Sequence, residues 1–312
     1  MAASVIHVCL GIPTFCRNDA LRELLYALGR LAPPTPGVSV DVVVFDNDPE
    51  RGAEDVVATN RAACSLPVRY RHVSPPGLSN VRNAALRFAE QHADLLVMID
   101  DDETPEPQWL NELLHIRAAT GAAVVVGPVR ATLPDNAPSW LRAFRECEYP
   151  SETDGAALSD GWSSNFLLDL GRVAAMRLRF DSAMNLTGGE DQLYFRQILA
   201  GGGSIRYAAN ATVWESLPAS RRSLLSILKR SFRRGGSLTI CDQRIKGSVG
   251  SMVLRLAKGG ALVALGLAAV VPTWVTRGTS AAVMSLCEIA RGLGMLAAFI
   301  GWRSEAYGHR AS

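Results

Sequence analysis

The sequence predicts an α/β fold with a mostly parallel sheet flanked by helices, followed by a hydrophobic helical appendage. Apolar runs of the β type alternate with amphipathic stretches through the first half of the 312 residues, a pattern typical of βαβ units. The composition becomes far more apolar in the last quarter of the chain. We therefore expect a globular domain over residues 1–238 and a membrane-associating helical region over residues 239–312.

The regular elements of the first half follow in order. Residues 5–12, 40–46 and 95–99 are apolar runs that predict strands. Between them, residues 19–31 and 78–91 place apolar side chains at helical spacing, which predicts amphipathic helices. Ligands usually bind outside the carboxyl ends of the strands in such a sheet. The residues that follow each strand are therefore the first candidates for a site.

The middle of the chain is less regular. Residues 130–161 contain Pro, Asp and Ser among aromatic side chains, which favours a long functional loop. A strand is expected at residues 165–169, and a helix at residues 190–200 that is stopped by the glycines at 201–203.

The C-terminal region combines basic and apolar stretches. Residues 220–234 form a basic amphipathic stretch, and residues 259–276 contain no ionisable side chain. That apolar stretch is about as long as the shortest helix that spans a bilayer, roughly 17 residues. A second one, residues 278–302, carries Glu288 and Arg291, which are spaced to pair on one helix face. An in-plane or re-entrant helical hairpin is the preferred interpretation; two spans or a soluble helical cap are the alternatives.

Charge and cysteine content exclude several classes of protein. The 32 Lys and Arg nearly balance the 30 Asp and Glu, so we expect no nucleic-acid partner. The six cysteines have neither zinc-site spacing nor the density of a disulfide scaffold, which favours reduced thiols in the cytoplasm. The N-terminus lacks the basic start and cleavage site of a signal peptide.

An apolar strand that ends in acidic residues has the strongest chemical implication. Residues 95–99 are followed directly by Asp100, Asp101, Asp102 and Glu103. Hard carboxylate oxygens suit Mg²⁺ or Mn²⁺, which proteins usually hold with one or two carboxylates and the phosphates of a substrate. The cluster therefore predicts a phosphate-bearing ligand and a divalent cation. The alternative is an acidic turn at the start of the next helix.

Four motifs in the same order resemble the family 2 glycosyltransferases, which have the Rossmann-like GT-A fold. The resemblance covers roughly the first 240 residues. The motifs are Ile12–Arg17, Val42–Asn47, Gly77–Asn83 and Asp100–Asp102. Carried over from the family, these motifs imply a nucleotide-sugar donor site and a metal site. The donor-binding residues would be Pro13, Thr14, Arg17, Asp46, Arg82 and Asp100, and the metal ligands Asp102 and Glu215.

Each of these residues also has a purely structural alternative. Thr14 and Asp46 are common turn residues, Arg17 can cap carbonyl groups and Arg82 can lie in solvent on its helix. Phe15 stands where the family usually has Tyr and keeps an aromatic face for stacking a base. Many related transferases have a metal-binding His near position 215, where this chain has Glu215.

The segment from Thr187 to Gln192 resembles the Glu-Asp motif of the family. The resemblance implies that Asp191 is the catalytic base and that Glu190 and Trp162 bind the acceptor. A carboxylate within about 3 Å of the acceptor hydroxyl can take its proton. We expect the glycines before Glu190 to allow a close approach of backbone to sugar. Alternatively, the two acids only favour the start of a helix.

Three further pieces resemble the branch of the family that builds bacterial exopolysaccharides of the succinoglycan type. They are Ser163–Phe166, Trp214–Arg221 and Lys229–Gly235, together with Arg291–Met295 near the C-terminus. The Gln-x-x-Arg-Trp signature of processive synthases is absent, which favours the addition of a single sugar.

The resemblance implies an inverting hexosyltransferase that moves a sugar from a nucleotide-sugar donor to a lipid-linked saccharide acceptor. Its expected location is the cytoplasmic face of the inner membrane, bound through the C-terminal region. Two other functions are compatible with the same residues. A sugar-phosphate nucleotidyltransferase also uses paired carboxylates, although no glycine-rich basic loop is present near the N-terminus. A non-catalytic membrane scaffold with a transferase fold is the third hypothesis.

Overall fold

The computed structural model describes residues 5–149, 152–185 and 188–300, which form two compact parts. The first, here called the sheet part, comprises residues 5–130, 152–182 and 194–216. The second, the helical part, comprises residues 131–149, 183–185, 188–193 and 217–300. Thr187 and Trp302, which belong to predicted segments, lie outside the described residues.

An eight-stranded mixed sheet forms the framework of the sheet part. Its order is β3-β2-β1-β4-β9-β6-β10-β8. The strands are β1 (Ile6–Thr14), β2 (Val38–Asp46), β3 (Val68–His72), β4 (Leu95–Ile99), β6 (Val124–Val126), β8 (Ala157–Leu158), β9 (Asn165–Asp169) and β10 (Ile205–Tyr207). Strands β1 to β4 are mutually parallel, whereas β9 runs antiparallel to both β4 and β6. The carboxyl ends of β1, β2 and β4 therefore meet at one edge.

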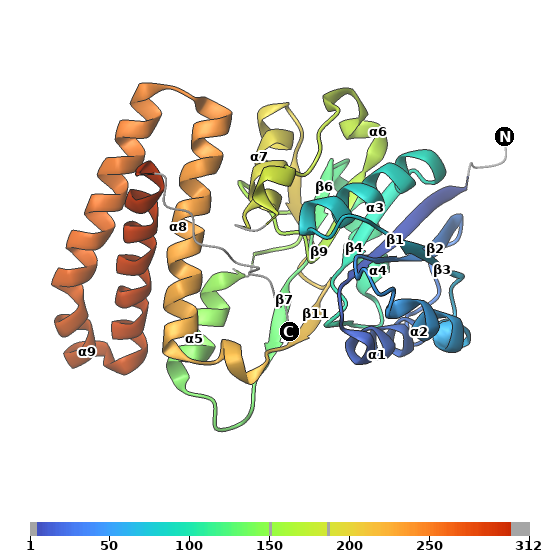
Figure 1. Cartoon of the computed structure of the whole chain (residues 1–312), viewed down its shortest axis with the longest axis horizontal. Helices are drawn as coiled ribbons and strands as arrows, with labels where there is room; N and C mark the ends of the chain where they lie inside the picture. Colours follow the sequence, from blue (N-terminus) through green and yellow to red (C-terminus); the bar gives the residue numbers. More distant parts are fainter. Residues whose placement is uncertain (1–4, 150–151, 186–187, 301–312) are drawn as a thin grey trace. The chain divides into compact units, whose positions relative to one another are not determined.

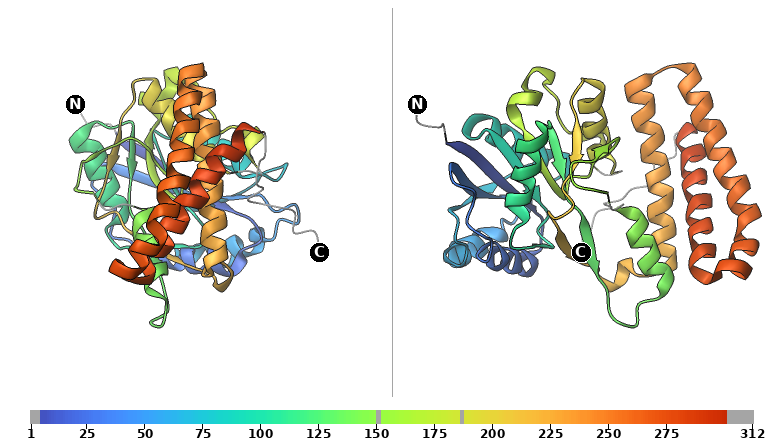
Figure 2. Two further views of the ribbon diagram at one scale, coloured as in Figure 1. Left: turned by 90° about the vertical axis from the view of Figure 1, so that its left-hand side faces the viewer. Right: turned by 180° about the vertical axis from the view of Figure 1, so that it is seen from behind.

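Helices cover both faces of this sheet. They are α1 (Asn18–Leu28), α2 (Ala53–Asn60), α3 (Leu78–His92), α4 (Trp109–Thr120), α6 (Leu170–Val173) and α7 (Glu190–Ala200), of which α7 begins in the helical part. Helix α3 packs against β1, β2 and β4, and α4 lies on the opposite face (Figures 1 and 2). Helix α4 ends at Gly121, whose φ of 62° is left-handed, a conformation that glycine adopts without strain.

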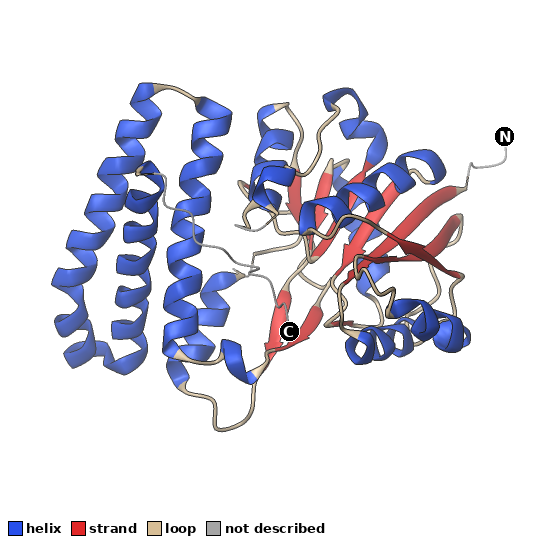
Figure 3. Cartoon of the chain, viewed as in Figure 1, coloured by secondary structure: helices blue, strands red, loops and turns tan. Residues whose placement is uncertain are grey.

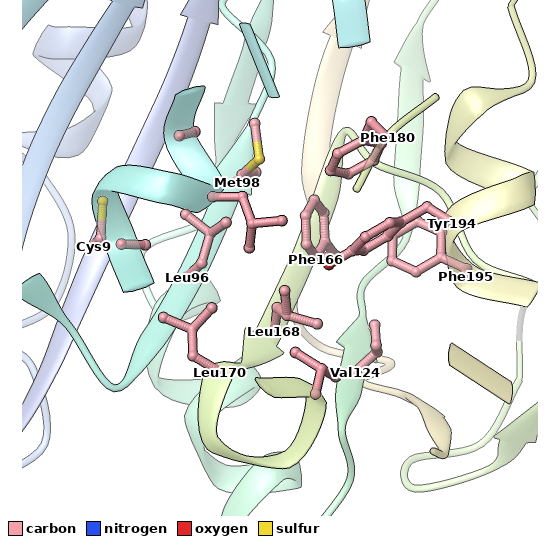
Figure 4. Packing of buried hydrophobic residues seen from close by; sticks show 14 of the residues in the cluster. Cys9, Leu96, Met98, Val124, Phe166, Leu168, Leu170, Phe180, Tyr194 and Phe195 are labelled. Atoms are coloured by element: carbon pink, nitrogen blue, oxygen red, sulfur yellow. The ribbon is translucent and has the colours of Figure 1, made fainter. Parts of the chain in front are cut away.

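The core of the sheet part explains why its strands are continuous apolar runs. All five residues of β4 are fully buried, as expected for a strand covered on both faces. Aromatic side chains from β9 and α7 meet in the same core: Phe166 and Phe195 are edge-to-face, and Phe180 stacks on Tyr194 (Figure 4). A three-stranded sheet of β5 (Glu103–Pro105), β11 (Val213–Ser216) and β7 (Val129–Thr132) follows the acidic turn.

The helical part contains α5 (Ser139–Glu148), α8 (Leu224–Lys246) and α9 (Val249–Phe299). Helix α9 is broken at Gly278, where φ is 79° and the chain turns back into a second arm. Figure 3 shows α8 and the two arms of α9 side by side. Leu141, Phe144, Ile227, Val283 and Cys287 join α5, α8 and the second arm in one apolar cluster.

Glycine permits a very close approach between these helices. A Cβ on Gly235 of α8 would lie 2.0 Å from the Arg291 carbonyl oxygen, and one on Gly294 would lie 1.9 Å from that of Phe232. The two arms of α9 touch in the same way, because a Cβ on Gly292 would lie 2.7 Å from the Gly259 oxygen. The segments 229–235 and 291–295, singled out in the sequence, therefore cross each other in space.

The outer surface of α9 is apolar and exposed. Its exposed side chains include Val253, Leu254, Leu265, Leu267, Val271, Trp274 and Val275. Among the described residues, α9 is the one helix long and apolar enough to cross a membrane, and only 11% of its most apolar window of 18 residues is buried. Glu288 and Arg291 form the expected ion pair within the second arm.

Most predicted elements are confirmed: the strands at 5–12, 40–46, 95–99 and 165–169 are β1, β2, β4 and β9. The expectation of a loop over residues 130–161 is wrong, because it contains α5 as well as β7 and β8. Helix α5 has only 10 residues, too few to be stable alone. It is held by Leu141 and Phe144 packing on residues far away in the chain. The predicted domain boundary at residue 238 falls inside α8.

Candidate active site

The acidic turn after β4 is the centre of the site in the sheet part. Asp101 and Glu103 are each 3% exposed, whereas the side chain of Asp102 is 22% exposed. The turn is closed by two hydrogen bonds: the Asp100 amide donates to a Glu103 carboxylate oxygen at 3.2 Å, and the Glu103 amide donates to the Asp100 carbonyl at 3.2 Å. Buried carboxylates are costly unless they are paired.

The end of β1 supplies that pairing. The Thr14 hydroxyl donates to Asp101 at 2.7 Å, and the Arg17 guanidinium donates to Asp101 at 2.9 Å and to Asp102 at 2.7 Å. Two of the predicted donor-binding residues, Thr14 and Arg17, thus contact the acidic turn itself. Asp101, the second of the four acids, was not predicted as a functional residue. What could have indicated Asp101 in the sequence is its position between Asp100 and Asp102, which were both predicted as site residues.

The charges at this turn shift several pKa values. Burial raises the pKa of Asp100 to about 7, with Asp102 and Asp101 raising it and Arg82 lowering it. Burial together with the charges of Asp100 and Glu215 raises the pKa of Glu103 well above its usual range. Repulsion among carboxylates and their loss of water are the physical cause. A bound cation would relieve both.

Glu215, predicted as a metal ligand, lies on the strand next to the acidic turn. Strand β11 pairs with β5 so that Glu215 stands opposite Glu103, and Glu215 is 7% exposed. Within the described residues, no three His, Cys, Asp or Glu side chains form a ready-made metal cage. The donor set nevertheless fits Mn²⁺ or Mg²⁺, because such ions take one or two carboxylates and complete their shell with substrate phosphates and water.

The loop after β2 is stabilised by its own polar side chains. Asp46 is fully buried, and its carboxylate accepts from the amides of Asp48 at 2.9 Å and Ala53 at 3.1 Å and from the Tyr70 hydroxyl at 3.0 Å. These contacts give Asp46 the structural role of a turn residue. Asn47 accepts from the Gly77 amide at 2.6 Å and so ties this loop to the start of α3.

Helix α3 directs Arg82 toward the acidic turn. Arg82 is 4% exposed, and its positive charge acts on Asp100. The helix is anchored by the Ser79 hydroxyl, which donates to the Asp181 carbonyl at 2.8 Å. Asn83 and Phe180 exchange two hydrogen bonds, at 2.7 and 2.8 Å. The polar residues of the Gly77–Asn83 motif therefore position Arg82.

Three other predicted residues of the sheet part have different surroundings. Pro13 is buried in β1, and Phe15 just beyond the strand is 52% exposed. Trp162 packs edge-to-face on Tyr207, and its indole N–H donates to the Gly127 carbonyl at 2.9 Å. Phe15 thus offers an aromatic face to a ligand, whereas the polar atom of Trp162 is already bound within the sheet part.

Asp191, the predicted catalytic base, and Glu190, predicted to bind the acceptor, lie at the start of α7, in the helical part. Glu190 is 2% exposed, and Asp191 is half-buried and accepts from the Gln192 amide at 2.7 Å. Gly188 and Gly189 both have positive φ, and a Cβ on Gly189 would lie 2.6 Å from that of Ser237. The left-handed backbone at both glycines and the contact of Gly189 with α8 give these residues a structural reason. The expected approach of backbone to the sugar stays a prediction.

The motifs at the strand ends coincide with a known family. The family model described as glycosyl transferase family 2 matches residues 9–180. The succinoglycan biosynthesis protein ExoM of Rhizobium meliloti (strain 1021) is 33% identical over 236 residues, which cover 75% of each protein. The chain belongs to glycosyl transferase family 2. The motifs at Thr14, Asp46, Arg82 and Asp100 all fall inside the matched segment.

Solved structures show the same fold. The mannosyltransferase PcManGT from Pyrobaculum calidifontis, in complex with GDP-Man and Mn²⁺, has a TM-score of 0.63 at 15% identity, over 94% of this chain and 88% of that one. S. aureus TarS 1–349, in complex with UDP-GlcNAc, has a TM-score of 0.52 at 13% identity, over 95% and 92%. This family 2 glycosyltransferase therefore has the GT-A fold that its sequence predicts.

Proposed function

We propose that this family 2 glycosyltransferase moves one sugar from a nucleotide-sugar donor to a lipid-linked saccharide, with inversion and with Mn²⁺ or Mg²⁺. The observation that carries the proposal is the cluster of carboxylates after β4, held by Arg17 and faced by Arg82. A nucleoside diphosphate would be repelled by these acids alone. It is attracted once a cation joins the two.

The relatives support this choice of ligands. PcManGT was solved with GDP-Man and Mn²⁺, and TarS with UDP-GlcNAc. The relative from Rhizobium meliloti is named as a succinoglycan biosynthesis protein, which supports a role in exopolysaccharide synthesis. Membership of a glycosyltransferase family argues against nucleotidyl transfer. Release of nucleoside diphosphate, and not of pyrophosphate, distinguishes the two reactions.

The proposed donor site uses the strand ends of the sheet part. Asp102 would hold the cation, with Glu215 as a second candidate ligand beside Glu103. The cation, when bound, neutralises the diphosphate as it leaves the sugar. Arg82 adds positive charge on the same side, and Phe15 offers a stacking surface for the base. Pro13, Thr14 and Asp46 would shape the base pocket indirectly, since Thr14 and Asp46 are engaged with the protein.

The proposed catalytic base is Asp191. The oxygen of an acceptor hydroxyl would form a bond to the anomeric carbon while the bond from that carbon to the diphosphate oxygen breaks, and the hydroxyl proton would pass to Asp191. Inversion follows, because attack and departure take place on opposite faces of the sugar. Glu190 and Trp162 would bind the acceptor, Trp162 through its ring, since its N–H is engaged.

We also propose that α9 docks the enzyme on the cytoplasmic face of the membrane, with its arms lying in the plane. The second arm packs on the basic helix α8, and Ser280 beside the turn bonds to Ser139 of the polar helix α5 at 2.9 Å. A turn that contacts a charged helix is not expected on the far side of a bilayer. The exposed apolar first arm fits an interfacial helix.

Calorimetry tests the donor site. The enzyme should bind a nucleoside diphosphate tightly with Mn²⁺ and weakly with chelator, and Asp102→Ala should lose the metal-dependent part. Asp19→Ala, at a carboxylate whose side chain is 91% exposed, serves as the control. Equal affinity with and without Mn²⁺ would overturn the metal-dependent site.

A further inference from the structure

The helical part contains a cavity of about 390 Å³ between α5, the segment before α8 and the first turns of α8. Its lining includes five cationic side chains and no acidic one. The five are Arg145, Arg221, Lys229, Arg230 and Arg233. Nothing in the proposed transfer reaction uses this cavity.

The cations are held in place by the fold. Glu148 of α5, with a side chain only 8% exposed, forms ion pairs with both Arg145 and Arg230. This one carboxylate orients two of the five positive charges that line the cavity. Like charges gathered at a partly buried surface repel one another. An anion bound among them would reduce that repulsion.

The rest of the lining determines which anion fits. Ser220 and Ser223 add hydroxyl groups, whereas the Ser226 hydroxyl already donates to the Ser223 carbonyl at 2.7 Å, and α8 begins at this cavity with Ser223 as its cap. Arginine side chains and hydroxyls suit the oxygens of phosphate and diphosphate. Phe144 is the aromatic side chain of the lining, but it is only 8% exposed and packs in the apolar cluster, which disfavours stacking of a nucleobase and hence a nucleotide.

Apolar side chains continue from the cavity to the surface. Leu141, Leu217 and Ile227 are buried at the cavity, whereas Leu225, which also lines it, is 61% exposed, and its neighbour Leu224 is 37% exposed. A phosphate among cations beside exposed leucines is the arrangement expected for a lipid whose headgroup enters the protein from a membrane surface.

We propose that this cavity binds the diphosphate through which the saccharide acceptor is attached to its lipid. The inference deepens the proposed function and rests on its lipid-linked acceptor. An acceptor that already carries sugars keeps its diphosphate away from the hydroxyl that is attacked. A second anion site, separate from the acidic turn that takes the donor, is therefore what such an acceptor requires.

Vesicle binding by the full-length protein tests the proposal. Phosphatidylcholine vesicles would carry either a polyprenyl diphosphate or phosphatidylglycerol at equal charge. Wild type should prefer the diphosphate vesicles by about tenfold or more, because charge-assisted hydrogen bonds add to the general attraction. Inorganic pyrophosphate should compete with this preference.

Two double variants remove equal charge from the same helix. Lys229→Gln with Arg233→Gln changes cavity residues, whereas Arg234→Gln with Arg244→Gln changes exposed residues outside the lining. The first pair should abolish the preference for diphosphate, and the second should keep it while weakening binding to both vesicles. If the first pair does not fold by circular dichroism, Lys229→Gln alone, at an exposed side chain, gives the same comparison.

Absence of a preference in wild type, or equal loss in both pairs, would overturn the diphosphate site and indicate general attraction to anionic lipids. Binding of a nucleoside diphosphate with and without Mn²⁺ is measured in parallel by calorimetry, because donor binding needs no acceptor. If wild type prefers diphosphate vesicles but binds no nucleoside diphosphate, the donor site of the proposed function fails and the cavity assignment stands. Metal-dependent nucleotide binding without a lipid preference would instead support the donor site and overturn the cavity assignment.

Discussion

The sheet part and the helical part contain apolar runs of similar character but use them in opposite ways. Leu95–Ile99 is fully buried in β4, because β1 and β9 pair with both of its edges and helices of the same part cover the two faces of the sheet. The apolar run of α9 leaves Leu265, Leu267 and Val271 between 64% and 69% exposed. Hydropathy alone does not distinguish the two runs. The difference lies in which surfaces the rest of the chain covers.

The sheet part and the helical part also differ in the sign of the charged side chains that they gather. The sheet part gathers carboxylates at the ends of its strands, where Arg17 and Arg82 offset them only in part. The helical part gathers cations around a cavity and pairs two of them with Glu148. Each arrangement favours a ligand of the opposite sign. We infer that a cation joins the donor to the sheet part and that lipid anions bind the helical part.

The largest effect is expected at the proposed catalytic base. Asp191→Asn keeps the shape of the side chain but cannot take the proton, so turnover should fall about 10²-fold or more. Affinity for the donor in the sheet part should stay within about twofold of wild type, because distant and independent sites change each other's binding free energy by only about 0.3–0.5 kcal/mol. Release of nucleoside diphosphate and calorimetry measure the two quantities. Turnover near that of wild type would move the role of base to Glu190.

Polar substitutions on the exposed surface of α9 should weaken membrane binding about tenfold or more, since burial of one leucine side chain contributes about 1.5–3 kcal/mol. Leu265→Gln, Leu267→Gln and Val271→Gln together should release the enzyme from vesicles even at low salt. The matched control is Val5→Gln with Tyr26→Gln, at side chains 49% and 48% exposed on the sheet part. This control should bind vesicles as wild type does.

High salt separates the two contributions to membrane binding, because it screens the basic residues but not the apolar ones. Wild type should therefore remain on the vesicles in a high-salt wash. If the triple variant binds like wild type, α9 does not dock on lipid. Its surface is then better explained as a contact with a second copy of the chain, which light scattering would detect.

Close helix packing should be the next most sensitive feature. Gly294→Ala places a Cβ at 1.9 Å from the Phe232 carbonyl oxygen, so it should cost about 1–3 kcal/mol or more of stability. Gly260→Ala, in the same helix, meets no atom within 4 Å and should be neutral or stabilising by up to about 1 kcal/mol. Thermal unfolding by circular dichroism measures both. Equal melting temperatures would contradict the crossing of α8 and α9.

The smallest expected effect is a dependence of stability on pH in the absence of metal. The pKa values of Asp100, at about 7, and of Glu103 are raised in the folded protein, so the folded form holds protons that the unfolded chain has lost. Stability should therefore fall as pH rises from about 5 to 8. The melting temperature in chelator should drop by a few degrees.

Asp100→Asn should flatten this dependence, whereas Asp19→Asn, at an exposed carboxylate, should not. Mn²⁺ with a nucleoside diphosphate should restore stability at the higher pH, since a bound cation favours the charged carboxylates. A stability that rises with pH in chelator would show that the acidic turn is already neutralised within the protein.

Local patterns were sufficient for the elements on which the donor site depends. The apolar run at 95–99, the acids after it and the polar residues of Gly77–Asn83 were all recognisable in the sequence. They become β4, the acidic turn and the start of α3. The spacing of apolar residues, the length of a strand and the side chains at its end all depend on residues that are neighbours in the sequence.

Partners that are distant in the chain could not be predicted in this way. The bonds of Thr14 and Arg17 to Asp101 join residues 84 to 87 positions apart. Helix α5 was expected to be loop, because its ten residues lie in a segment with Pro, Asp and Ser, and its stability comes from Leu217, Ile227 and Val283. The reason for Gly189 also became clear only with Ser237 beside it.

By itself, the sequence determined the family, the strand that ends in carboxylates and the presence of an apolar C-terminal hairpin, because each depends on neighbouring residues. The tertiary structure decided which oxygens Thr14 and Arg17 contact, that Asp46 is engaged in its own loop, and that five cations line one cavity. These depend on which distant surfaces meet. Burial, ion pairing and exposure arise only when the chain has folded.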